Sequence, residues 1–123
     1  MTREDAVRFA HEWAAAWNEL AIERVLAYFD ENVSFTSPTA LAVVGVATVQ
    51  GKPALREYWT RALSQITALH FTIDRVVWDP SARELAVIYE SEINDQKKQV
   101  TENLSFGEQG LVVKAEVFHG AGA

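Results

Sequence analysis

The stretch Gln99-Val100-Thr101-Glu102-Asn103-Leu104-Ser105-Phe106 alternates polar and apolar residues, and it decides how the second half of the chain folds. A period of two is typical of a β-strand with one buried face. The more apolar set forms the inner face of this strand: Val100, Glu102, Leu104 and Phe106. A shift by one residue would bury three polar side chains instead. The strand therefore carries one carboxylate, Glu102, on its inner face.

The chain from His70 onward contains three turn signals, and they divide it into four strands. The turns are Asp79-Pro80-Ser81, Asn94-Asp95 and Gly107-Glu108-Gln109-Gly110. Short turns between consecutive strands predict an antiparallel meander. The inner face of the strand before the quoted one is expected to hold Leu85, Val87, Tyr89, Ser91 and Ile93. The inner face of the last strand is expected to hold Leu111, Val113, Ala115, Val117 and His119.

The turn lengths set which residues face one another. A four-residue loop over 94–97 would place Tyr89 directly opposite Glu102, within reach of a phenol–carboxylate hydrogen bond. Pairing Phe106 with Leu111 would place Glu102 opposite Ala115, and His119 about 13 Å further along at the rise of a strand. We therefore expect a Tyr89–Glu102 pair and no direct contact between Glu102 and His119.

Both polar candidates also have an ordinary structural interpretation. A buried carboxyl group is costly unless it is paired or protonated, and such groups are enriched at functional sites although structural pairs also occur. A functional and a structural role for Glu102 both stay open. His119 lies near the end of the sequence given, and its ordinary interpretation is a solvated side chain.

The first half of the chain has helical periodicity. Thr2 and Asp5 form an approximate capping box, and an apolar stripe at spacings of four follows it: Phe9, Trp13 and Trp17. This helix is expected to end near Asn18. A second, short helix is expected over residues 22–29, with a turn at 30–32.

A first strand is expected around Val33 and Phe35, and it ends at Ser37-Pro38. Residues 41–49 are rich in β-branched side chains and predict a second strand or an ordered cover. Gly51-Lys52-Pro53 then begins a third helix, because proline suits a first helical turn. Helices followed by strands are the pattern of an α+β domain.

The composition excludes several classes of function. The 123 residues fit one domain, 1–123, and contain no cysteine, which excludes disulfides, thiol catalysis and cysteine-bound metals. The formal charge is −6 and the only basic pair is Lys97-Lys98, so we expect no nucleic-acid partner. No apolar run is long enough to cross a membrane and no signal peptide is recognisable, so we expect a cytoplasmic protein. The histidines lack metal-ligand spacing, and no metal or cofactor is expected.

Three stretches carry a family resemblance. The residues 16–18, 25–29 and 32–38 resemble the opening of the nuclear transport factor 2-like superfamily, most of all its SnoaL-like branch of polyketide-cyclase relatives. Residues 51–59 resemble the third-helix signature of that branch, and 113–119 are similar to its final strand. The resemblance implies a cone: three N-terminal helices packed on a highly curved mixed, mainly antiparallel sheet that encloses an apolar pocket.

The superfamily contains ketosteroid isomerase, scytalone dehydratase, limonene epoxide hydrolase, polyketide cyclases, and binding or association domains without chemistry, so fold alone does not decide function. By this resemblance, the general base of ketosteroid isomerase corresponds to Ser37, its helix-one tyrosine to Trp13 and its protonated aspartate to Glu102. A serine hydroxyl cannot take a carbon-bound proton near neutral pH without its own base. We therefore expect no steroid isomerisation by that mechanism.

These observations favour a small-molecule-binding protein with an apolar pocket. The alternative is an isomerase, cyclase or dehydratase that acts on a small apolar carbonyl or hydroxyl metabolite by acid–base catalysis. The candidate catalytic residues are Glu102, Tyr89 and His119. The candidate pocket residues are Trp13, Trp17, Ser37, Tyr58, Trp59, Leu104, Ala115 and Val117. The expected partners are a small apolar molecule and a second copy of the chain, bound through the outward sheet face that carries Ile88, Val112 and Phe118.

Overall fold

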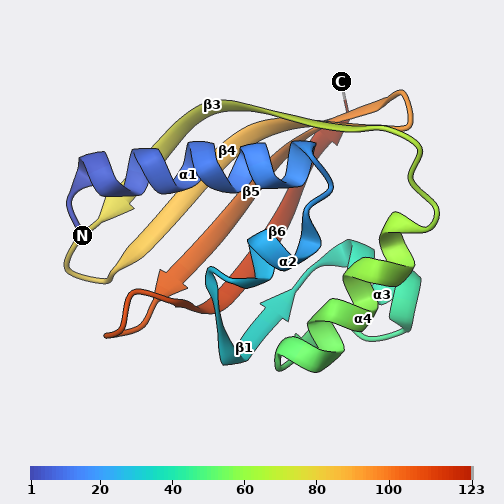
Figure 1. Ribbon diagram of the computed structural model, residues 1–123. Coiled ribbons are helices and arrows are strands. Elements are labelled where there is room, and N and C mark those ends of the chain that lie inside the picture. Colours follow the sequence, from blue (N-terminus) through green and yellow to red (C-terminus); the bar gives the residue numbers. More distant parts are fainter. Residues whose placement is uncertain (123) are drawn as a thin grey trace.

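The computed structural model describes the backbone of residues 1–122 and the side chains of residues 1–120. Four helices and six strands lie in this part of the chain (Figure 1). In chain order they are α1 (Arg3–Asn18), α2 (Ile22–Leu26), β1 (Phe29–Thr36), α3 (Pro38–Val44), β2 (Thr48–Gln50), α4 (Lys52–Leu63), β3 (Leu69–Asp79), β4 (Glu84–Ile93), β5 (Gln96–Phe106) and β6 (Val112–Gly122). The predicted α+β class is confirmed.

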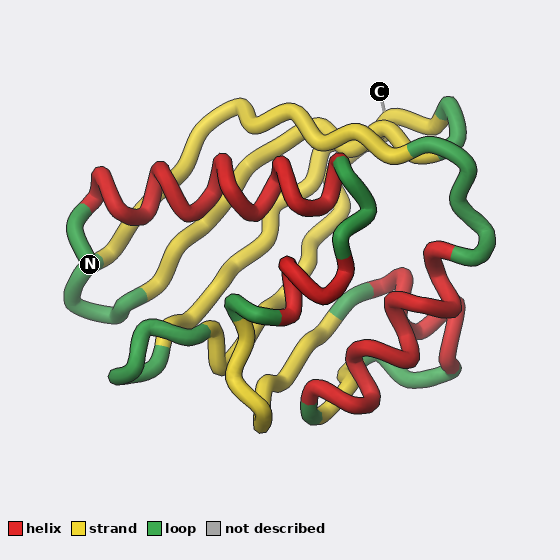
Figure 2. The backbone as a smooth tube through the Cα atoms, viewed as in Figure 1, coloured by secondary structure: helices red, strands yellow, loops and turns green. Residues whose placement is uncertain are grey.

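The strands form one mixed sheet in the order β2-β1-β6-β5-β4-β3. Strands β3 to β6 form the predicted antiparallel meander, and only the β1–β6 pair among the described strands is parallel. The sheet curves around the helices: α1 lies along the inner face of β3 to β5, while α3 and α4 lie beside β1 (Figures 1 and 2). This arrangement is the curled cone that the sequence predicts.

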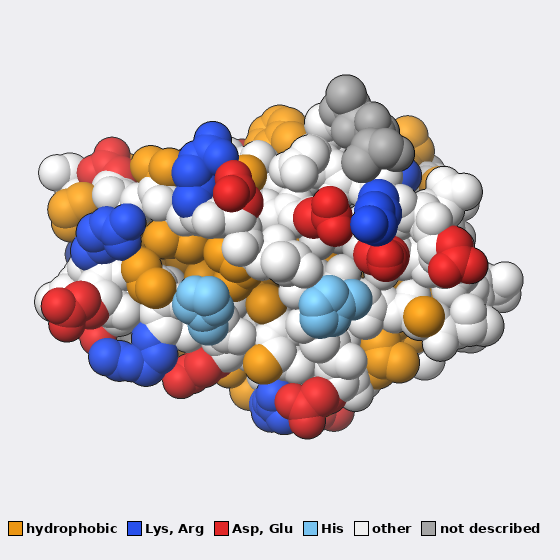
Figure 3. All heavy atoms as spheres, turned by 90° about the horizontal axis from the view of Figure 1, so that it is seen from above, with side chains coloured by type: hydrophobic (Ala, Val, Ile, Leu, Met, Phe, Trp, Pro, Cys, Tyr) orange, Lys and Arg blue, Asp and Glu red, His pale blue; other side chains and the backbone are white. Residues whose placement is uncertain are grey.

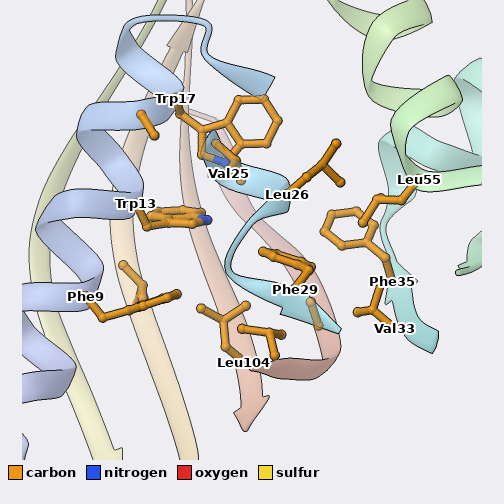
Figure 4. Close-up of a cluster of buried hydrophobic side chains, with 14 of the residues drawn as sticks. Phe9, Trp13, Trp17, Val25, Leu26, Phe29, Val33, Phe35, Leu55 and Leu104 are labelled. Carbon is orange, nitrogen blue, oxygen red and sulfur yellow. The ribbon is translucent and has the colours of Figure 1, made fainter. Parts of the chain in front are cut away.

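The core fills the space between α1, α2 and the inner face of the sheet. Figure 4 shows side chains from α1, α2, β1, α4 and β5 pointing toward one another. Trp13, Phe29 and Leu104 are among the fully buried side chains, and burial of such groups contributes about 1.5–3 kcal/mol each. Helix α1 begins at the predicted capping box, in which Thr2 Oγ1 accepts from the Asp5 amide and Asp5 Oδ2 accepts from the Thr2 amide.

The helical half differs from the prediction in three places. Helix α2 ends at Leu26, and Phe29 begins β1, where it pairs with Val112; residues 30–32 therefore lie in a strand with an irregular register and do not form a turn. Residues 38–44 form a fourth helix, α3, because the Ser37 hydroxyl caps it by accepting from the Thr39 amide. The second strand is short, Thr48–Gln50, and α4 is the helix that the sequence predicted to begin near Gly51.

The β4–β5 turn contains two residues and not four. Asn94 and Asp95 both have positive φ angles, 49° and 69°, as a type I′ hairpin turn requires. Ile93 therefore pairs with Gln96, and Tyr89 faces Val100. The predicted direct pairing of Tyr89 with Glu102 is wrong by two residues, and the two side chains are diagonal neighbours on the same face.

The β5–β6 register is also shifted from the prediction. The register shifts between Ser105 and Phe106, so that Phe106 pairs with Val112. As a result, Glu102 faces Val117 and Val100 faces His119. The predicted pairing of Glu102 with Ala115 is therefore wrong, and His119 lies two residues along the strand from the position opposite Glu102. The same irregularity buries Val112, which was assigned to the outward face, and leaves Val113 partly exposed.

The end of α1 is tied to the edge strand β3 by one side chain. Asn18 Oδ1 accepts from the Phe71 amide at 2.7 Å, and Asn18 Nδ2 donates to the Phe71 carbonyl at 3.2 Å. Because a residue in an antiparallel ladder points its N–H and C=O to the same side, both Phe71 groups face away from β4. Asn18 thus occupies the place of a neighbouring strand at this one position.

The surface of the described residues mixes the two signs of charge. On the face shown in Figure 3, Lys and Arg side chains are interspersed with Asp and Glu, and no continuous basic area forms there. None of the helices in the described chain is long and apolar enough to cross a membrane.

Candidate functional site

A cavity of about 120 Å³ lies between α4 and the inner faces of β4, β5 and β6. Aromatic side chains form much of its wall: Trp17, Phe35, Trp59 and Phe71. Their packing is edge-to-face where Trp59 meets Trp17 at 4.8 Å and Phe35 at 5.5 Å between ring centroids. Such contacts hold large side chains in fixed orientations, so the walls are rigid.

Glu102 projects into this cavity from β5. Its neighbours on the same face, Val100 and Leu104, hold it inward, and only 5% of Glu102 is exposed. The Tyr89 hydroxyl donates to Glu102 Oε1 at 3.4 Å, which confirms the expected inward position and partner despite the different register. Burial raises the pKa of Glu102 to about 8, and the hydrogen bond from Tyr89 opposes that rise. Near neutral pH the group is therefore mainly a neutral carboxylic acid.

Tyr89 is held in place by aromatic neighbours. Its ring packs edge-on against Trp13 at 5.3 Å and in a tilted arrangement against Phe71 at 4.7 Å between centroids. Burial, followed by the adjacent Glu102, raises the pKa of Tyr89 well above its ordinary value of 10. The phenol therefore keeps its proton and acts as a hydrogen-bond donor.

Hydroxyl groups line the opposite wall, where α3 begins and α4 passes. Burial raises the pKa of Tyr58 to about 12, and the nearby hydroxyls of Ser37 and Thr39 partly offset this rise. Ser37 is buried, and its oxygen is occupied as the cap of α3. This wall offers neutral hydroxyls and no base.

His119 of β6 lines the same cavity at its outer side, and its side chain stays largely exposed. Burial, and then the positive charge of Lys98, lowers the pKa of His119, so the imidazole is neutral near pH 7. Glu102 and His119 therefore share one cavity as an uncharged acid and an uncharged base. No group of three potential metal ligands occurs among the described residues.

A model of the SnoaL-like domain matches residues 10–107, which is most of the chain. The chain belongs to the SnoaL-like domain family. The match includes both sides of the cavity as far as β5, with Ser37, Tyr58, Tyr89 and Glu102 inside it. A search of curated proteins finds no match to the sequence.

Solved structures agree with this membership of the SnoaL-like family. A SnoaL-like protein of unknown function from Burkholderia thailandensis E264 superposes with a TM-score of 0.87 at 25% identity, over 98% of each chain. A putative ketosteroid isomerase from Kribbella flavida DSM 17836 superposes with a TM-score of 0.73 at 18% identity, over 96% of this chain and 79% of that one. SalBIII, described as an epoxide hydrolase/cyclase-like enzyme in pyran ring formation in salinomycin, superposes with a TM-score of 0.74 at 17% identity, over 95% and 92%. The last two share the fold.

The pocket residues predicted from the sequence lie in two places in this SnoaL-like domain. Those that line the cavity are Trp17, Ser37, Tyr58, Trp59 and Val117. Those that lie fully buried in the core beneath it are Trp13, Leu104 and Ala115. Phe71 and Thr39 also line the cavity, and the sequence pattern did not identify them. The pattern of β3 did not assign its faces, and no helix was expected over 38–44. Ser91 belonged to the predicted inner face of β4, and its place there could have named it.

A second chamber, of about 380 Å³, continues the cavity of this SnoaL-like domain outward. The two spaces share residues from α3, α4, β4, β5 and β6 and from the segment after α4: Thr39, Ala62, Ile66, Ser91, Ile93, Val100 and His119. The β4–β5 turn lies beside this chamber, where Asn94 Oδ1 accepts from Thr67 and Ala68 amides and Asn94 Nδ2 donates to the Gln65 carbonyl. This turn is therefore fixed to the segment after α4.

Proposed function

We propose that this SnoaL-like domain binds a small, largely apolar molecule through a carbonyl or hydroxyl oxygen, and that Glu102 anchors that oxygen. The observation that carries the proposal is one buried, protonated carboxyl group at an otherwise mainly aromatic and aliphatic cavity. Glu102 Oε1 accepts the hydrogen bond from the Tyr89 hydroxyl, and Glu102 Oε2 has no hydrogen-bond partner among the described residues.

The chemistry of the cavity favours a ligand that accepts a hydrogen bond. A neutral carboxyl group has one O–H to donate, and covering it without supplying an acceptor costs about 1–3 kcal/mol. A ligand oxygen avoids that cost, whereas a hydrocarbon of the same shape incurs it. The aromatic walls contribute the rest of the affinity through burial of apolar surface.

Matched ligands test the proposal. Hexanophenone and hexylbenzene differ only in a carbonyl group, and their binding can be followed by the fluorescence of Trp17 and Trp59 in the cavity wall. We expect the ketone to bind about 5- to 100-fold more tightly at pH 6, the range that a buried hydrogen bond supports. Because Glu102 donates only while protonated, this preference should fall as the pH rises through about 8.

Two variants separate hydrogen bonding from shape. Glu102→Gln retains a donor at every pH, so it should keep a preference for the ketone that no longer depends on pH. Glu102→Leu has no donor and should bind both compounds alike. Equal binding of ketone and hydrocarbon by the unmodified protein, or no binding of either, would exclude this function.

A second candidate function is acid–base catalysis on such a carbonyl compound. The observation in its favour is that Glu102 and His119 line one cavity with pKa values displaced in opposite directions, a common arrangement of acid and base. His119 would take a proton from the carbon next to the carbonyl while Glu102 gives its proton to the oxygen, which yields an enol; the reverse steps restore the ketone.

Exchange in heavy water tests this chemistry. NMR should show deuterium entering hexanophenone at the carbon next to the carbonyl, and His119→Ala or Glu102→Gln should slow the exchange about 10²–10⁴-fold with binding nearly intact. Exchange no faster than in buffer would leave binding as the function. We expect no isomerisation of a Δ5-ketosteroid, because Ser37 is occupied as the cap of α3.

We also propose that two copies associate through the outward face of the sheet. In the register of the meander, Arg75, Ile88, Thr101 and Phe118 form one row across β3 to β6. Phe118 is 52% exposed, and Val77 on the same face is 56% exposed. Sedimentation should detect a dimer at micromolar concentration that Phe118→Lys dissociates, and a purely monomeric unmodified protein would exclude the proposal. A specific interface of this kind buries at least about 1,200 Å².

A further inference from the structure

The outer chamber has a different character from the inner cavity. Its described lining mixes polar side chains with apolar ones, and it includes the amide side chains of Gln65 and Gln96. Lys98 is the one Lys, Arg, Asp or Glu among the described residues that line it. A ligand that extends out of the inner cavity therefore meets a single positive charge at the mouth.

The alternation of β5 directs Lys98 toward this mouth. Lys98, Val100 and Glu102 follow at intervals of two on the inner face of the strand, so Lys98 and Glu102 are separated by about 13 Å along it. Lys97 falls on the outward face, in the position paired with Glu92. None of the ion pairs among the described residues involves Lys98. Its positive charge contributes to the lowered pKa of His119, which lines the same chamber.

We propose that the natural ligand is an amphipathic carboxylic acid, with its carboxylate against Lys98 at the mouth and its apolar body, which carries the oxygen bound by Glu102, in the inner cavity. This inference rests on the proposed function and names the class of ligand. A chain with a net charge of −6 repels anions at long range, so a single cation at the mouth is the feature that admits one. One lysine and two amides suit a single negative charge, whereas a phosphate would leave its second charge without a partner.

A keto acid tests the role of Lys98. The probes are hexanophenone and the keto acid that carries a carboxylate in place of its terminal methyl group. We expect the keto acid to bind about 3- to 10-fold more tightly at low ionic strength, as for a partly exposed ion pair, and the advantage to shrink when salt is added. Lys98→Met should abolish the advantage and leave the affinity for hexanophenone unchanged.

A matched control lies one residue away. Lys97→Met removes the same charge from the same strand but from the outward face, so it should keep the preference of the unmodified protein. Equal binding of the two probes, or an equal loss in both lysine variants, overturns the assignment of a carboxylate to Lys98 while the proposed function stands. Failure of both probes to bind removes the proposed function and this inference with it.

Discussion

The two ends of β5 carry the same alternation of residues but border different interiors. Toward its C-terminal end, Leu104 is fully buried in a core that Trp13 and Phe29 fill. Toward its N-terminal end, Val100 and Glu102 border the cavity. The difference comes from what stands opposite, since aromatic side chains fill the first region whereas the second is walled by α4 and the start of α3. Alternation predicts which side chains point inward, and the facing layer decides whether they are packed or left beside a cavity.

The largest expected effect comes from shortening a leucine in the filled core, compared with the same change in the cavity wall. Leu104→Ala opens a void in a filled core, and such changes cost about 2–5 kcal/mol of unfolding free energy. Leu63→Ala removes the same atoms from a half-buried side chain of α4 in the cavity wall. We expect a loss on the order of 1 kcal/mol there, because less apolar surface is lost from the interior and no new isolated cavity is created.

Denaturant unfolding of both variants measures the difference. Equal losses of unfolding free energy at Leu104 and Leu63 would mean that the core and the cavity wall are packed alike. This result would contradict the distinction between the two regions. An unchanged denaturant slope in both variants would show that the comparison concerns the folded state.

The second prediction concerns how Glu102, which lines the cavity, makes the stability of the protein depend on pH. Burial raises the pKa of Glu102 to about 8 from an ordinary value of 4.5. The folded protein therefore holds a proton that the unfolded chain releases, and stability is fully present below about pH 4.5 and is lost as the pH rises to about 8. The slope approaches about 1.4 kcal/mol per pH unit within that window.

Glu102→Gln isolates this effect. The difference in unfolding free energy between the unmodified protein and this variant should change steadily from pH 5 to pH 8. The lowered pKa of His119 acts in the opposite direction, and it is common to both proteins. The exposed carboxyls whose pKa values are lowered, Asp5, Glu19 and Glu23, act only at more acidic pH. A flat difference would show that Glu102 is hydrated or paired in solution.

The smallest expected effect comes from the hydrogen bond between Tyr89 and Glu102. Tyr89→Phe should cost up to about 1 kcal/mol, since the bond is long at 3.4 Å. Because this bond opposes the rise in the pKa of Glu102, its loss should move the upper end of the pH window further up. Adding Tyr89→Phe to Glu102→Gln should produce no such shift, and an unmoved window in the single variant would count against the pair.

Much of the fold could be predicted from the sequence, because local signals set it. The capping box at Thr2, the apolar stripe of α1 and the alternation around Glu102 each agree with the structure. Residues 38–44 could not be assigned, because β-branched side chains favour a strand while the decisive cap at Ser37 is a single hydroxyl.

The candidate site was harder to predict, because its geometry depends on register. An error of two residues at the Asn94-Asp95 turn and an irregularity at Phe106 were enough to mispair Glu102 with both neighbouring strands. The side of the sheet that Glu102 faces was still correct, since shifts by two preserve the face. The separation of His119 from Glu102 along β6 was overestimated for the same reason, and both side chains line the cavity.

The bridge from Asn18 to Phe71 also bears on how this protein behaves at high concentration. Strand β3 is an edge of the sheet, and an edge strand with free backbone groups invites pairing with a strand of another molecule, which begins aggregation. Asn18 already occupies the outward N–H and C=O of Phe71. A strand that approached β3 in register would have to displace this amide, so a single side chain blocks continuous edge-to-edge growth at that position.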